Sequence, residues 1–97
     1  MKNSDPLEKT IEDKVCKYAK DKGCLMYKFT SPARRSVPDR LFITLEGRHF
    51  FIEFKRKGKE PTPAQRVEIN KIRFNKGTVW VVDNVNRGKQ IIDLETL

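Results

Sequence analysis

Residues 37–57, VPDRLFITLEGRHFFIEFKRK, decide the fold that this sequence predicts. Two apolar runs, 40–45 and 49–55, flank the short connection 46–48, whose central glycine is typical of a β-hairpin. Alternation along the second run gives one apolar face and one face that mixes aromatic and charged residues. The stretch therefore predicts two antiparallel strands, and the charged residues at their ends need a reason.

The other elements follow from hydrophobic periodicity and from the prolines and glycines that interrupt it. We expect helices over 7–22 and from Pro63 to just before Gly77, strands over 24–29 and 78–82, and a short helix around 87–92. The order of the core is αβββαβ. This order predicts an α/β fold in which helices flank a mixed β-sheet, within a single domain over residues 1–97.

The charge balance points to a polyanionic partner. The chain has 97 residues, and its 21 Lys and Arg against 13 Asp and Glu give a net charge of +8. Such a charge on a small body attracts nucleic acid, although many small basic proteins bind none. With 37% hydrophobic residues the chain is expected to fold rather than remain disordered.

Several other classes of protein are not indicated. Cys16 and Cys24 lie eight residues apart without a CxxC motif or a histidine at zinc-ligand spacing, so we expect reduced thiols. No apolar run approaches the length of a membrane span, and the first residues lack the apolar core of a secretory signal. We therefore expect a soluble cytoplasmic protein that uses no nucleotide cofactor.

Asp39, Glu53 and Lys55 explain the charges in the hairpin. Asp39 starts one strand and Glu53 ends its partner, so antiparallel pairing brings the two carboxylates to one end of the sheet. Lys55 shares the face of Glu53, about 6 to 7 Å further along. Two carboxylates, with the backbone carbonyl of Phe54 as a further ligand, suit Mg²⁺ or Mn²⁺. With a lysine that orients or deprotonates water, they predict a site for phosphodiester hydrolysis.

Basic residues flank both acids in the sequence and are candidates for a rim that binds DNA phosphates. These are Arg34, Arg35, Arg40, Arg56, Lys57 and Lys59.

The same residues carry a resemblance to a known family. The tripeptide Val37-Pro38-Asp39, thirteen intervening residues and Glu53-Phe54-Lys55 resemble the PD-(D/E)xK signature of a large nuclease superfamily. GRHFFIEFKRKGKEPTPAQ, residues 47–65, further resembles the virus-type replication-repair nuclease domain, VRR-NUC. The resemblance covers about residues 8–83 and implies a restriction-endonuclease-like core. It also suggests a stand-alone phage-type protein, which would act in the cytoplasm of the host cell.

The resemblance implies further site residues. It assigns Asp39 and Glu53 to the metal and makes Lys55 catalytic, and it adds an acid from the first helix. Both Glu8 and Glu12 border the apolar stripe of that helix, and similarity of residues 11–23 to phage junction-resolving endonucleases favours Glu12 as an additional metal ligand. Gln65 matches the glutamine of the family at the start of the second helix, where it is expected to brace Lys55 or a phosphate.

Together these features predict a metal-dependent, structure-selective DNA endonuclease. Branched DNA such as a Holliday junction is the expected substrate, and two symmetric cuts favour a homodimer. The alternative is a non-catalytic, basic nucleic-acid-binding module on a nuclease-like fold. A sequence-specific restriction-type enzyme ranks lower, because 97 residues leave little room for a recognition subdomain.

Overall fold

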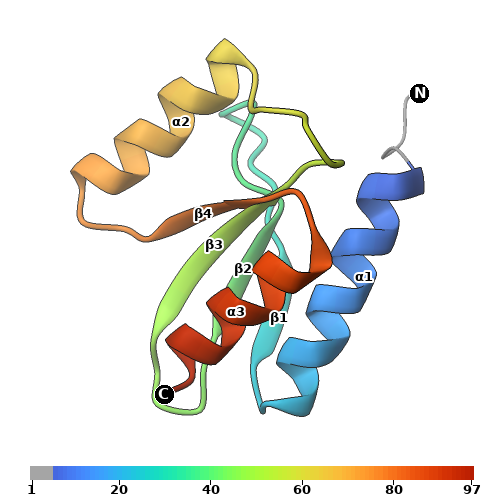
Figure 1. Cartoon of the computed structure of the whole chain (residues 1–97). Coiled ribbons are helices and arrows are strands. Elements are labelled where there is room, and N and C mark those ends of the chain that lie inside the picture. Colours follow the sequence, from blue (N-terminus) through green and yellow to red (C-terminus); the bar gives the residue numbers. More distant parts are fainter. Residues whose placement is uncertain (1–5) are drawn as a thin grey trace.

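The structure, a computed structural model, describes residues 6–97. It has seven helices and strands in the order αβββαβα (Figure 1). These are α1 (Pro6–Asp21), β1 (Leu25–Lys28), β2 (Arg40–Ile43), β3 (His49–Phe54), α2 (Pro63–Phe74), β4 (Val79–Val82) and α3 (Val85–Glu95). The expected core order is confirmed, and α3 extends it.

The four strands form one mixed sheet in the order β1-β2-β3-β4. The hairpin at residues 40–54 is confirmed: β2 and β3 pair antiparallel, with Arg40 opposite Ile52 and Phe42 opposite Phe50. β4 joins the other edge of β3 in parallel, after the crossover through α2. The α/β fold with a mixed sheet that the sequence predicts is therefore confirmed.

The helices lie on both faces of the sheet (Figure 1). α1 and α3 pack against each other and enclose the main core, to which β2, β3 and β4 contribute the largest side chains. The core residues are Val15, Ala19, Cys24, Phe42, Phe50, Ile52, Phe54, Val82, Ile91 and Ile92. The opposite face carries Phe51 and Glu53 and is flanked by α2 and by the connection between β1 and β2, whose Phe29 ring lies 5.0 Å from that of Phe51. This face is the one that positions the candidate site.

The tail forms a longer helix than the sequence predicted. A short helix was expected around 87–92, whereas α3 runs from Val85 to Glu95. Asn84 caps its start by accepting a hydrogen bond from the backbone N–H of Arg87, and Ile91 and Ile92 are buried against the sheet. The expected boundaries were wrong because burial against α1 stabilises a segment whose own periodicity is weak.

Gly88 sets the distance between α1 and α3. A Cβ atom at this position would lie 2.4 Å from Cγ2 of Val15. Gly88→Ala is therefore expected to lower the free energy of unfolding by about 1–3 kcal/mol through overpacking, despite the higher helix propensity of alanine. Urea denaturation measures the change, and Asn86→Ala, at an exposed position on the same helix, is the control. Equal or greater stability of Gly88→Ala would show that the two helices can separate at little cost.

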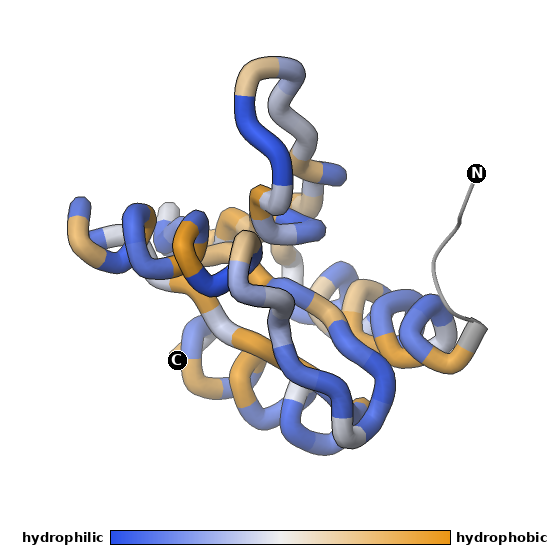
Figure 2. Tube along the Cα trace, turned by 90° about the horizontal axis from the view of Figure 1, so that it is seen from above, coloured by the Kyte–Doolittle hydropathy of each residue, from blue (hydrophilic) through white to orange (hydrophobic). Residues whose placement is uncertain are grey.

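Hydrophobic residues concentrate along the strands and on the inner sides of the helices, whereas the outer turns are largely hydrophilic (Figure 2). Among residues 6–97, none of the helices has the length and apolar character needed to cross a membrane.

Candidate active site

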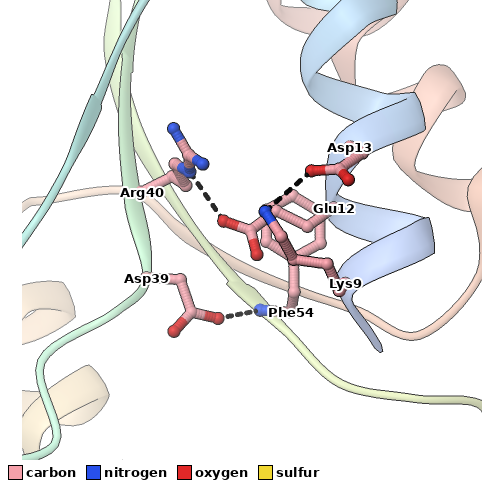
Figure 3. A network of polar contacts seen from close by, with 6 residues as sticks. All are labelled: Lys9, Glu12, Asp13, Asp39, Arg40 and Phe54. Carbon is pink, nitrogen blue, oxygen red and sulfur yellow. Dashed lines mark hydrogen bonds and ion pairs between the residues drawn. The ribbon is translucent and has the colours of Figure 1, made fainter. Parts of the chain in front are cut away.

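Asp39 and Glu53 meet at the end of the β2–β3 hairpin. Arg40 pairs with Ile52, so the same register places Asp39 opposite Glu53. The Oδ2 atom of Asp39 accepts a hydrogen bond of 2.8 Å from the backbone N–H of Phe54, which fixes the side chain against β3 (Figure 3). Antiparallel pairing thus brings together the two acids that the sequence predicted as neighbours.

Glu53 is the most deeply buried charged side chain of the site. Its side chain is 2% exposed. Its Oε2 atom lies 3.3 Å from Nζ of Lys55 and accepts a hydrogen bond of 2.9 Å from Nε2 of Gln65. Its Oε1 atom is buried and has no hydrogen-bond partner among the described residues. A buried carboxylate oxygen without a partner costs free energy unless a cation or proton binds it.

Burial raises the pKa values of both carboxyls, and a neighbouring carboxylate adds to each shift: Asp39 to that of Glu53, and Glu12 to that of Asp39. Desolvation raises the pKa of Glu53 to about 7, and the charge of Asp39 adds to this, while Lys55 opposes it. Desolvation also raises the pKa of Asp39, against the hydrogen bond from Phe54. A bound divalent cation is therefore expected to stabilise the ionised forms of these two adjacent acids.

The raised pKa of Glu53 predicts a pH-dependent stability without divalent cations. The folded chain keeps this proton up to about pH 7, whereas the ordinary pKa is 4.5. Between pH 4.5 and about pH 7 the folded state therefore binds more protons than the unfolded state. The stabilising contribution of Glu53 is lost as the pH rises through this range. In EDTA, the free energy of unfolding of wild type relative to Glu53→Gln should fall across it by on the order of 1–3 kcal/mol. If the free energies of unfolding of the two proteins, measured by urea denaturation, changed equally with pH, this prediction would be contradicted.

Glu8 and Glu12, the two candidate acids of α1, both lie near the site, but in different settings. Glu12 is 5% exposed, and its Oε2 atom lies 2.6 Å from Nε of Arg40 (Figure 3). Its charge raises the pKa of Asp39, whereas that of Glu8 raises the pKa of Glu53. Glu12 is thus held beside Asp39 by an ion pair that the sequence did not predict.

Gln65 contacts a different partner from the one expected. The sequence predicted that it braces Lys55 or a phosphate, whereas its Nε2 donates to Glu53. Its Oε1 accepts from the backbone N–H of Thr62, and Thr62 Oγ1 accepts from the backbone N–H of Gln65. This capping box at the start of α2 fixes the amide, so that its NH₂ group points to the carboxylate. The Thr-x-x-Gln spacing at the start of the helix is the sequence signal that could have revealed this capping box.

The basic residues fall into three groups. Arg56 and Lys59 line a cavity of about 290 Å³ together with Glu8 and Lys55, next to the two acids. Arg35 and Lys57 are exposed. Arg34 forms an ion pair of 3.0 Å with Glu68 of α2, and Arg40 is engaged by Glu12, so these two guanidinium groups also hold elements of the chain together.

The donor set suits a hard divalent cation. Asp39 and Glu53 supply adjacent carboxylates, and the Oε1 atom of Glu53 has no other partner among the described residues. Within residues 6–97, no three side chains of histidine, cysteine, aspartate or glutamate form a ready metal cluster. Ions such as Mg²⁺ use few protein carboxylates and keep water ligands, so two acids are sufficient.

Comparisons with known proteins agree with this geometry. No family model matches the chain. A curated relative, "Putative nuclease p44" of Acyrthosiphon pisum secondary endosymbiont phage 1, is 44% identical over 61 residues. The match spans 63% of this chain and 61% of that relative, which is less than two thirds of its length. A solved structure titled "VRR_NUC domain" matches with a TM-score of 0.83 at 25% identity, over 89% of this chain and 94% of that one.

The match to the solved structure covers nearly the whole of both chains. The resemblance that the sequence indicates is therefore confirmed: the chain has the fold of a VRR-NUC nuclease domain.

Proposed function

We propose that the chain is a Mg²⁺- or Mn²⁺-dependent DNA endonuclease that cuts branched DNA, such as Holliday junctions, as a homodimer in the cytoplasm. The observation that carries the proposal is the Glu53 carboxylate, which is buried beside Asp39 with its Oε1 atom lacking any partner among the described residues. The nuclease-like fold and the phage relative support the same activity.

The residues of the site would have separate roles in hydrolysis. Asp39 and Glu53 would hold the cation, with the carbonyl of Phe54 and the carboxylate of Glu12 as further candidate ligands. A bound divalent cation lowers the pKa of a ligand water and neutralises charge on the scissile phosphate. Lys55, whose side chain is 14% exposed and whose Nζ lies 3.3 Å from Glu53, orients the attacking water or contacts a phosphate oxygen.

Substrate choice is tested by comparing labelled DNAs of equal length. Wild type is incubated with a four-way junction, a flap and a linear duplex in Mg²⁺, Mn²⁺ or EDTA. We expect symmetric, metal-dependent cleavage of the junction and little cleavage of the duplex. Metal-independent binding without cleavage would favour the basic binding module instead, which the charge of +8 also supports. Cutting of every duplex at one sequence would favour a restriction-type enzyme.

A homodimer follows from the requirement for two cuts. The chain offers one pair of acids, whereas resolution of a four-way junction needs two cuts related by symmetry. Light scattering at the concentration of the cleavage assay should give twice the mass of 11.4 kDa. A monomeric mass together with full junction cleavage would remove the dimer from the proposal.

The contact between Gln65 and Glu53 predicts a positioning role for the glutamine. Gln65→Ala removes the 2.9 Å hydrogen bond to Oε2 and frees the carboxylate to rotate. Groups that orient metal ligands commonly contribute 10- to 100-fold, so we expect cleavage and Mn²⁺ affinity to fall by about that factor. Single-turnover cleavage and calorimetry measure the two effects. Gln90→Ala, at an exposed position on α3, serves as the control. A loss of cleavage with unchanged Mn²⁺ affinity would place Gln65 on the DNA instead.

A further inference from the structure

A second cavity lies on the same face of the sheet as Glu53. Its volume is about 460 Å³, within the range of roughly 300–1,000 Å³ that is usual for small-ligand sites. Phe29, Phe51 and Ile72 form its apolar walls, and Arg34 and Lys71 lie among its polar lining residues. The cavity separates the connection between β1 and β2 from α2, and these two segments lie beside each other in Figure 1.

Two aromatic rings give this cavity a surface suited to a flat ligand. The ring centroids of Phe29 and Phe51 are 5.0 Å apart, with an angle of 49° between the ring planes. Both residues are only partly buried, so part of each ring remains open to the cavity. An apolar aromatic wall with polar groups around it fits a ligand that has a flat apolar face and a polar edge.

The cavity directly adjoins the candidate active site. Phe51 precedes Glu53 by two residues on the same face of β3, which is about 6 to 7 Å by strand rise. The backbone N–H of Phe29 donates to the carbonyl of Asp39 at 2.9 Å. DNA held at the two acids would therefore pass the mouth of the cavity. Lys71 places a cationic group there that can meet a phosphate of the nucleotide, whereas Arg34 is paired with Glu68, another lining residue, at 3.0 Å.

We propose that this cavity binds the base of an unpaired nucleotide at a DNA branch point, stacked on one of the rings of Phe29 and Phe51 and packed against the other. The inference rests on the proposed nuclease function, because it names the DNA feature that the enzyme selects. Base-paired DNA keeps its bases stacked within the helix, whereas a flap or an open junction can release one at little cost. The cavity thus favours branched over continuous duplex DNA.

Two flaps that differ only in their single-stranded arm test this proposal. One arm carries thymidines and the other carries abasic sites, so the phosphates are equal in number. Binding is measured by fluorescence anisotropy with the Lys55→Ala chain in Mg²⁺, so that cleavage does not interfere. Base stacking on aromatic residues predicts about tenfold weaker binding of the abasic arm. Equal affinity for the two arms would overturn the proposal.

Matched substitutions assign the preference to the cavity. Phe29→Ala should abolish the difference between the arms, whereas Phe74→Ala should retain it, because Phe74 is 84% exposed on α2 and does not line the cavity. Ser31→Leu narrows the cavity from the loop and should also abolish the difference, which covers the case that Phe29→Ala fails to fold. A base preference that survives Ser31→Leu would overturn the proposal. If the protein prefers the thymidine arm but wild type cleaves no DNA, the base-binding role of the cavity would stand and the nuclease function would be overturned.

Discussion

A Glu53→Gln variant is expected to cleave branched DNA roughly 10³-fold more slowly than wild type in Mg²⁺. The substitution keeps the shape of the side chain and its contact with Gln65, whose Nε2 lies 2.9 Å from Oε2 in the wild type. It removes the negative charge that attracts a divalent cation to the site. Single-turnover cleavage of a four-way junction under excess enzyme measures the chemical step.

The same variant is expected to be at least as stable as wild type near neutral pH without metal. Glu53 is buried beside Asp39, and the charge of Asp39 helps to raise its pKa to about 7, so a neutral amide relieves both costs. Thermal unfolding in EDTA compares the proteins, and Glu46→Gln in the exposed hairpin turn is the control for both assays. A large loss of stability in Glu53→Gln would show that the carboxylate is structural, and an unchanged cleavage rate would remove it from the site.

Lys55→Ala is expected to slow the chemical step by about 10²- to 10⁴-fold, the usual range for a residue that transfers or orients a proton. Its ammonium group lies 3.3 Å from Oε2 of Glu53, and its charge opposes the rise in the pKa of that carboxyl. Lys55→Arg should not restore the rate, because a guanidinium group stays protonated and needs a wider space.

Lys57→Ala separates chemistry from DNA binding. Lys57 is exposed two residues beyond Lys55, so its loss should weaken binding and lower the dependence of affinity on salt. The single-turnover rate under saturating enzyme should remain close to that of wild type. If Lys57→Ala and Lys55→Ala lower this rate equally, the special role of Lys55 would be refuted.

The sequence predicted the parts of the fold that depend on local pattern. The hairpin at 40–54 follows from alternation around a glycine-bearing turn, and this pairing alone placed Asp39 opposite Glu53. The extent of α3 did not follow, because its buried face is defined by α1, with Gly88 against Val15. A helix stabilised mainly by a distant partner carries only a weak signal in its own residues.

The contacts of individual side chains at the site were harder to predict. The sequence identified Glu12 and Arg40 separately, as a metal ligand and as part of a DNA-binding rim, but not their ion pair of 2.6 Å. Gln65 was expected to brace Lys55 or a phosphate, and in the structure it donates to Oε2 of Glu53, the atom that also lies 3.3 Å from Nζ of Lys55. Both contacts depend on how a helix sits over the sheet and on side-chain rotamers, which residue spacing does not specify.

The decisive experiment is cleavage of a labelled four-way junction by wild type and Asp39→Asn, each in Mg²⁺ and in EDTA. Asp39→Asn keeps an oxygen that can accept the hydrogen bond from the N–H of Phe54, so the local fold should persist. We expect rapid cleavage by wild type in Mg²⁺ only, and a rate near background for the variant in both conditions. Equal cleavage by the two proteins, or cleavage by wild type in EDTA, would contradict a metal-dependent nuclease site built on Asp39 and Glu53.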